Sequence, residues 1–183
     1  MEENHTLENF DTVKNKMTSS TTNVIFYNDP FSKTRFLNKI MDSFEDQIIY
    51  LDFDLLYSGY VESGYIPKTS NTKIIKLDSK NLQDSLPSIL SKISSEKTIL
   101  ILDSLNGLYN FSDDENPARF VNSLVMLMAT NAKFSKSILF VTCLGQKKDE
   151  IWTLPSGRHI LEFENINRFE INENDMKSEI QPI

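Results

Sequence analysis

The chain has 183 residues, enough for one domain with its own core, and its formal net charge of −7 excludes an extended basic face. Because domains that grip nucleic acid by themselves usually carry such a face, we expect no strong autonomous nucleic-acid binding. The single cysteine, Cys143, excludes an internal disulfide framework and predicts a cytoplasmic protein. Every hydrophobic run is too short to span a bilayer, and His5 and His159 lack companions at zinc-ligand spacing, so neither membrane nor zinc binding is expected.

Residues 1–22 are acidic, rich in Asn and Thr, and lack an apolar segment behind a basic start. This composition predicts a flexible N-terminal arm rather than a signal peptide. One α/β domain is predicted over residues 23–172. A loose C-terminal tail is predicted over residues 173–183.

Apolar runs predict five strands: Val24–Tyr27, Gln47–Phe53, Lys73–Leu77, Thr98–Asp103 and Ser137–Leu144. Of these, Gln47–Phe53 and Thr98–Asp103 are expected to be buried. Apolar residues at helical spacing predict three helices: Ser32–Phe44, Asn81–Ile93 and Ala118–Ala132. Leu55–Thr72, which holds two glycines and a proline, is predicted to be a loop or a short irregular excursion. Two final runs, His159–Glu164 and Asn167–Asn172, predict an antiparallel edge hairpin. Strands that alternate with helices indicate a three-layer α/β domain with a mostly parallel central sheet.

The turn after the first strand partly matches the phosphate-binding P-loop pattern G-x-x-x-x-G-K-[ST]. Lys33 and Thr34 satisfy its last two positions, whereas Tyr27 and Ser32 occupy its glycine positions. In such a site Lys33 would reach a phosphate and the Thr34 hydroxyl would bind magnesium. Glycines allow the backbone to wrap closely around a phosphate, so their absence favours an ordinary strand–turn–helix with a surface Lys-Thr pair.

Carboxylates follow two of the predicted strands, at the edge where parallel α/β sheets bind ligands. Asp103 ends a run of four aliphatic residues and is a candidate for orienting magnesium, while Asp52 and Asp54 end the second strand. One of these two would position an attacking water. The alternative is that these aspartates only start turns or cap helices. Ser104 has no general base near it in the sequence and is better interpreted as a turn or cap residue.

The order of these motifs resembles the ATPase core of the RecA/RadA/KaiC family over roughly residues 23–172. In that family the second strand typically ends in Asp-Thr-Glu, whose glutamate activates water, and Asp54 stands at that place. The Walker B strand typically ends in Ile-Asp-Ser, which is similar to the segment Ile101–Ser104. The segment Pro155–Arg158 loosely resembles the Pro-x-Gly-Gly turn of archaeal and eukaryotic recombinases.

The resemblance implies a RecA-like P-loop NTPase-type fold with ATP and magnesium as cofactors. It implies nucleotide contacts from Ser32, Lys33, Thr34 and Asp103, magnesium ligands in Thr34 and Asp103, and a water-positioning Asp54. The missing glycines depart from the family, as does Cys143-Leu144 where a phosphate-sensing Asn-Gln is usual. In its degenerate Walker A motif the chain resembles recombinase paralogues and the RecA-fold subunits of the Elongator accessory ring, which keep the fold while losing the Walker motifs.

Three functional hypotheses follow from these patterns. The favoured one is a pseudo-ATPase that serves as an accessory or scaffold protein, acts through a protein partner or a homo-oligomer, and takes part in DNA recombination or repair. The first alternative is an active ATP-binding ATPase of the RecA/KaiC type, and the second is an unrelated doubly wound α/β ligand-binding domain. We expect Lys33 and Asp103 to lie side by side at one edge of the sheet, and Lys33→Ala to leave folding nearly unchanged.

Overall fold

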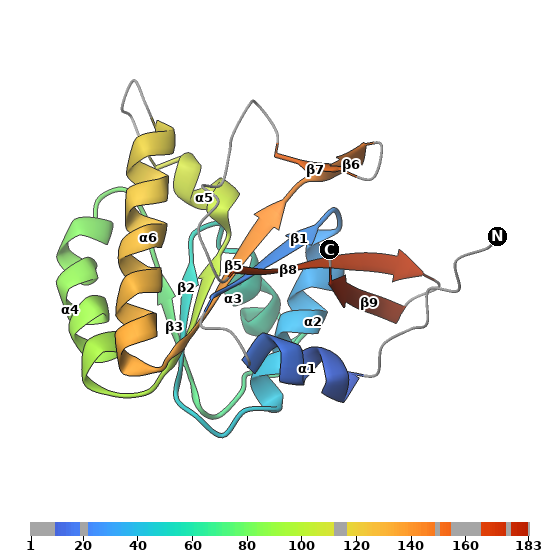
Figure 1. Ribbon diagram of the computed structural model, residues 1–183, viewed down its shortest axis with the longest axis horizontal. Helices are drawn as coiled ribbons and strands as arrows, with labels where there is room; N and C mark the ends of the chain where they lie inside the picture. The colour runs from blue at the N-terminus through green and yellow to red at the C-terminus, as the bar shows by residue number, and fades with distance from the viewer. Residues whose placement is uncertain are drawn as a thin grey trace.

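The computed structural model describes residues 10–18, 22–111, 117–148, 151–154, 166–174 and 177–182. Within these residues, seven strands form one sheet with helices on both of its faces (Figure 1). In the order in which they lie in the sheet, the strands are β3 (Thr72–Lys76), β2 (Ile48–Asp52), β4 (Ile99–Asp103), β5 (Ile138–Leu144), β1 (Thr22–Tyr27), β8 (Ile166–Asn174) and β9 (Lys177–Pro182).

Strand direction confirms the predicted fold class. The neighbouring strands from β3 to β8 pair in parallel, and β9 pairs antiparallel with β8 at the edge. The sheet is therefore mostly parallel with an antiparallel C-terminal edge hairpin, as expected. Within the described residues this hairpin is formed by β8 and β9. The predicted run His159–Glu164 lies outside the described residues.

Helices cover the two faces of the sheet as separate layers (Figure 1). One layer contains α1 (Phe10–Thr18), α2 (Pro30–Asp42) and α3 (Leu56–Glu62), and the other contains α4 (Leu82–Ser95), α5 (Leu105–Tyr109) and α6 (Pro117–Ser135). A separate two-stranded hairpin, β6 (Gln146–Lys148) with β7 (Ile151–Thr153), follows β5 directly.

Side chains that alternate along each strand pack against one helix layer or the other, so the core has two parts. In β1, Val24 packs in the core under α4, α5 and α6, whereas Ile25 packs under α1, α2 and α3. In β4, Leu100 and Ile101 divide in the same way. Successive strand residues point to opposite faces, so an uninterrupted apolar run is what a sheet covered on both faces requires.

Two segments that the sequence analysis leaves irregular form helices. Residues 10–18 of the predicted arm form α1, in which Val13 and Met17, four residues apart, are fully buried. Leu55–Thr72 contains α3, whose first turn is fixed when the backbone N–H of Leu56 donates to Asp54 Oδ1 at 3.1 Å. Tyr57 then packs against Tyr50 of the sheet with ring centroids 4.2 Å apart. Tertiary packing therefore supplies order that these short stretches do not signal alone.

The C-terminal segment also differs from the expectation of a loose tail. Lys177–Pro182 forms β9, which pairs with β8 from the register of Phe169 with Pro182 to that of Asn174 with Lys177. This strand is held by backbone hydrogen bonds to β8, which depend little on the side chains. Its sequence therefore lacks the alternation of apolar and polar residues by which a strand is predicted. Residues 1–9 and 19–21 of the predicted arm lie outside the described residues.

Candidate functional site

The strand ends bring four polar side chains together on the face of the sheet that α2 covers. Tyr50 and Asp52 lie two residues apart on β2, so they point to the same face. Asp103 is the register partner of Asp52 on β4, and Thr142 lies on β5, the next strand. Neighbouring strands in register place same-face side chains next to one another, which is why these residues converge.

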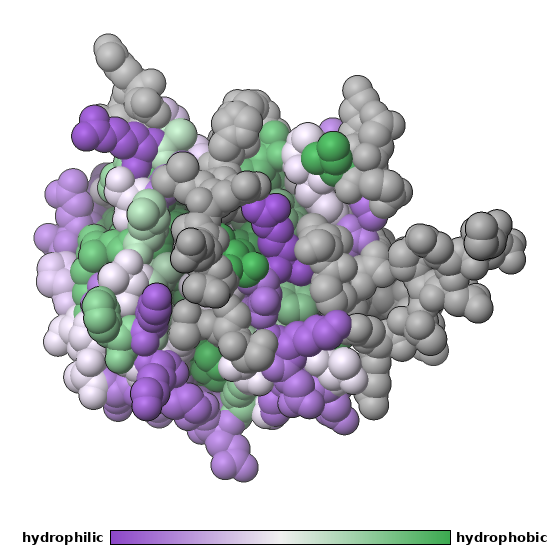
Figure 2. Space-filling view, viewed as in Figure 1, coloured by the Kyte–Doolittle hydropathy of each residue, from purple (hydrophilic) through white to green (hydrophobic). Residues whose placement is uncertain are grey.

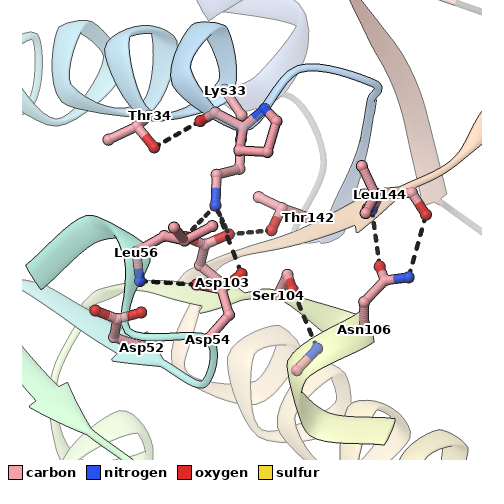
Figure 3. A network of polar contacts seen from close by, with 12 residues as sticks. Lys33, Thr34, Asp52, Asp54, Leu56, Asp103, Ser104, Asn106, Thr142 and Leu144 are labelled. Carbon is pink, nitrogen blue, oxygen red and sulfur yellow. Dashed lines mark hydrogen bonds and ion pairs between the residues drawn. The ribbon is translucent and has the colours of Figure 1, made fainter. Parts of the chain in front are cut away.

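Lys33 reaches this cluster from the first turn of α2 (Figure 3). Its Nζ lies 2.7 Å from Oδ1 and 2.6 Å from Oδ2 of Asp103, and neither side chain is exposed to solvent. The same Nζ lies 3.9 Å from Asp54 Oδ2. The structure confirms the prediction that Lys33 and Asp103 lie side by side at one edge of the sheet.

Asp103 receives further hydrogen bonds from the sheet itself. The Thr142 hydroxyl donates to Oδ1 at 2.5 Å, and the Tyr50 hydroxyl donates to Oδ2. Burial, and then the neighbouring Asp103 carboxylate, raise the pKa of Tyr50 well above its usual range, so this hydroxyl stays a donor. Each carboxylate oxygen of Asp103 therefore already accepts two hydrogen bonds, which is its ordinary capacity.

The N-terminus of α2 lacks the cradle that a P-loop forms. Only Asn28 and Asp29 separate β1 from α2, and Pro30, the first helical residue, has no N–H to donate. The Asp29 carboxylate caps the helix by accepting from the Ser32 backbone N–H at 2.5 Å. A protein carboxylate thus occupies the place where a helix N-terminus would hold a phosphate.

The side chains at the remaining P-loop positions are also buried and make their contacts within the protein. Tyr27 is the last residue of β1, is buried, and has its ring centroid 5.1 Å from Lys33 Nζ. Thr34 is fully buried, and its hydroxyl donates to the Pro30 carbonyl at 2.8 Å. Ser32, Lys33 and Thr34 in this arrangement do not fit a magnesium–nucleotide phosphate, and their nucleotide-binding roles stay predictions.

A cluster of three aspartates lies below Lys33 (Figure 3). One carboxylate oxygen from each of Asp52, Asp54 and Asp103 lies within 4.8 Å of the other two. Asp52 is fully buried, its Oδ2 accepts from the Ser58 backbone N–H at 2.8 Å, and its Oδ1 has no hydrogen-bond partner. Burial raises the pKa of Asp52 to about 6, because removal from water disfavours the charged form. The expected role of Asp54 in positioning water stays a prediction.

Helix α5 closes the other side of the strand ends. Ser104 caps this helix by accepting from the Gly107 N–H at 3.2 Å, which confirms its interpretation as a cap residue. Asn106 donates to the Leu144 carbonyl at 3.2 Å and accepts from the Leu144 N–H at 2.8 Å. The backbone of Leu144, where the sequence resemblance leads us to expect a phosphate sensor, is thereby paired within the protein.

The sequence analysis missed Tyr50, Thr142 and Asp29 as members of this site. Tyr50 and Thr142 carry a signal in hindsight, since each is a polar side chain inside an otherwise apolar strand, and Tyr50 lies one period before Asp52. Asp29 followed by Pro30 is a helix-start pattern. That Asp29 takes the place of a phosphate at the N-terminus of α2 depends on the connection between β1 and α2 being only two residues long.

Comparisons with known proteins support the fold. No protein-family model and no curated protein sequence matches the chain. Among solved structures, a DnaB-like replicative helicase, described together with its interactions with primase, matches with a TM-score of 0.55 and 10% sequence identity. The match covers 85% of this chain and 48% of the helicase chain, so this chain spans about half the helicase's length. The likeness and the sheet topology together show a RecA-like α/β fold.

In the described part of the chain, no helix is both long and apolar enough to cross a membrane.

Proposed function

We propose that this protein is a RecA-like accessory or scaffold protein in which nucleotide hydrolysis is weak or lost. The observation that carries the proposal is the buried, bidentate contact between the Lys33 ammonium and the Asp103 carboxylate. In a working P-loop this lysine reaches the phosphates of the nucleotide. Here a protein carboxylate takes the place of the phosphate, so the phosphate contact has become an internal ion pair.

Replacing that ion pair by a nucleotide would be costly. If Lys33 turned to a phosphate, Asp103 would stay buried without its positive partner, and breaking a buried pair costs about 3–5 kcal/mol. Such a cost lowers affinity by roughly two to three and a half orders of magnitude. A phosphate would also approach Asp29 at the helix N-terminus, and like charges repel. These costs favour a site that holds the fold together over one that turns over ATP.

Two exposed apolar surfaces support a role in association. The first, the aromatic patch, contains Phe31, Tyr60 and Tyr65, with ring centroids 5.5 Å apart for the first pair and 6.4 Å for the second. Tyr65 is 75% exposed, and Arg35 lies 5.8 Å from the ring centroid of Phe31. Aromatic residues and arginine dominate the residues that carry binding energy in protein interfaces.

The second surface, the α6 stripe, runs along the outside of α6. It contains Phe120, Leu127 and Phe134, spaced seven residues apart, and Phe134 is 85% exposed. Figure 2 shows apolar areas among hydrophilic ones over the region of α4 and α6. Apolar residues repeating every seven positions are typical of a helix that packs against another helix. We expect one of the two surfaces to bind the partner subunit, which is either another protein or a further copy of this chain.

Nucleotide binding provides the direct test. The 183-residue protein is heated with and without Mg-ATP, and phosphate release is followed in wild type, in Lys33→Ala and in Lys73→Ala, which removes an exposed lysine of β3. We expect no thermal shift and background release in all three. Nucleotide at one hundred times its dissociation constant would add about 2.7 kcal/mol of stability. Turnover in wild type and Lys73→Ala that is lost in a Lys33→Ala protein shown to be folded by thermal unfolding would establish the alternative, an active ATPase.

Partner capture tests the accessory role separately. Tagged wild type is used to isolate bound proteins from native extract, in parallel with Tyr65→Ser for the aromatic patch and Phe134→Ser for the α6 stripe. One of these variants should lose a protein that wild type retains. Since both side chains are largely exposed, the thermal stability of the variants should stay close to that of wild type. Retention of the same proteins by both variants would contradict the assignment of these surfaces.

A further inference from the structure

We propose that Asp52, Asp54 and Asp103 form a binding site for a hard divalent cation that requires no nucleotide. The three aspartates come from the end of β2, the β2–α3 connection and the end of β4, and one oxygen of each lies within 4.8 Å of the others. Two oxygens on opposite sides of one Ca²⁺ lie about 4.6–5.2 Å apart, and on Mg²⁺ about 4.0–4.2 Å. The cluster therefore has the dimensions of a coordination shell before any side chain moves.

An unpartnered oxygen inside the cluster points to a ligand independently of the acidic composition. Asp52 Oδ1 is the one buried side-chain nitrogen or oxygen in the described part of the chain that has no hydrogen-bond partner. Buried polar atoms are nearly always paired, and an exception needs a physical reason. The other oxygen, Oδ2, is held by the Ser58 backbone N–H, which fixes the orientation of the carboxylate. A cation between the aspartates supplies the missing contact.

Charge leads to the same conclusion. Three carboxyl groups face the Lys33 ammonium, which lies 2.6 Å from Asp103 and 3.9 Å from Asp54. Counted as ionised groups, they leave two negative charges in a site where only Asp54 is partly exposed, at 20% of its side chain. A buried charge is stabilised when it is paired or bound to a metal, and otherwise the group tends to take up a proton. One divalent cation neutralises the site.

Lys33 and the cation compete for the carboxylate of Asp103. Both Asp103 oxygens already accept two hydrogen bonds, including those from Lys33, so the first ligands are Asp52 Oδ1 and Asp54. Full use of Asp103 requires that Lys33 withdraws. In a phosphate site of the P-loop type, lysine and metal both bind the nucleotide and support one another. Here removal of the lysine should strengthen cation binding, whether or not the protein ever binds a nucleotide.

Terbium luminescence tests the site in the 183-residue protein without nucleotide. Tb³⁺ replaces Ca²⁺ in oxygen sites and emits when a nearby tyrosine is excited, and the Tyr50 hydroxyl contacts Asp103 directly. We expect saturable emission from wild type that CaCl₂, MnCl₂ or MgCl₂ displaces. Asp52→Asn should lower the affinity at least tenfold, and Lys33→Met should raise it. Asp84→Asn, which removes an exposed carboxylate of α4, should leave it unchanged.

Folding of the variants is checked by thermal unfolding in EDTA. The amide of Asp52→Asn retains an oxygen for the Ser58 N–H, so this variant should fold. Asp54→Asn, at a partly exposed position, gives a second loss of affinity if Asp52→Asn does not fold. Calorimetric titration of wild type with each chloride salt measures the affinity without the probe. Absence of saturable binding to wild type would overturn the proposal. So would binding that survives both asparagine substitutions, or binding that weakens in a folded Lys33→Met protein.

Discussion

The Lys33 ammonium contacts both carboxylate oxygens of Asp103, at 2.7 Å from Oδ1 and 2.6 Å from Oδ2, and the two side chains are completely buried. This burial reverses the expectation from sequence that Lys33→Ala leaves folding nearly unchanged. Removing one partner of a buried pair leaves the other charge uncompensated. We therefore expect Lys33→Met to lower the free energy of unfolding by about 3–5 kcal/mol, measured by urea denaturation in EDTA.

A double-mutant cycle isolates the pair from other effects of these substitutions. Asp103→Asn should also destabilise the protein, because it leaves the Lys33 ammonium buried without a negative partner. The protein with both substitutions should be less destabilised than the sum of the two single changes, by about 0.5–3 kcal/mol, since the two residues are in direct contact. Additive effects would contradict an energetically coupled pair.

The site was partly predictable because strand ends determine where side chains meet. Asp103 ends one buried parallel strand and Lys33 lies in the helix that follows another, so their proximity follows from the pattern of apolar runs. What Lys33 does there could not be predicted, because the same Lys-Thr pair fits both a phosphate site and a surface turn. The difference depends on the burial of Lys33 and on its distance from Asp103, which arise only when α2 packs on the sheet.

Asp52 shows the same limit in another form. Sequence places it at a strand end beside Asp54, and the family resemblance gives the functional role to Asp54. In the structure, Asp52 carries the unpartnered oxygen. Asp52 lies two residues after Tyr50 on β2, so both side chains point to the face of the sheet under α2 and α3. Helix α3, which supplies the Ser58 N–H, was not predicted, so the hydrogen bond that orients the Asp52 carboxylate could not be anticipated from the sequence.

The cap of α2 gives a second prediction. Asp29→Ala removes the acceptor for the Ser32 N–H and should lower the free energy of unfolding by about 0.5–2 kcal/mol. Asp29→Asn is the matched control, since asparagine caps helices about as well as aspartate. This substitution should lower the free energy of unfolding by no more than a few tenths of the loss caused by Asp29→Ala. Urea denaturation of the three proteins measures the difference. Equal losses for both substitutions would show that the charge, rather than the cap, is what matters.

Two glycines form a matched pair for testing the packing of α5 against the site. A Cβ added at Gly107 would lie 2.9 Å from the carbonyl carbon and the Cβ of Phe53, next to Asp54. Gly107→Ala should therefore force the β2–α3 connection away and cost about 1–3 kcal/mol. A Cβ at Gly59, inside α3, meets nothing within 4 Å. Gly59→Ala should be neutral or stabilising by up to about 1 kcal/mol, and thermal unfolding distinguishes the two. A Gly107→Ala protein as stable as wild type would contradict the close contact.

The last prediction concerns the dependence of stability on pH. Burial raises the pKa of Asp52 to about 6, whereas an aspartate in the unfolded chain has a pKa of about 3.9. Between these values the folded protein binds more protons than the unfolded chain, so this group lowers the free energy of unfolding as pH rises. Its contribution is fully present below about pH 4 and is lost as pH passes through about 6. A shift of about two pKa units corresponds to about 3 kcal/mol.

Comparison of wild type with Asp52→Asn separates this group from every other carboxylate. The other acids are the same in both proteins, so their contributions largely cancel in the difference between the two unfolding free energies. In EDTA, wild type should lose stability relative to Asp52→Asn from about pH 4 to pH 7, with the steepest change between the two pKa values. Urea denaturation at each pH measures the difference. A difference that stays constant over this range would show that the Asp52 carboxyl has the same affinity for protons in the folded and unfolded states.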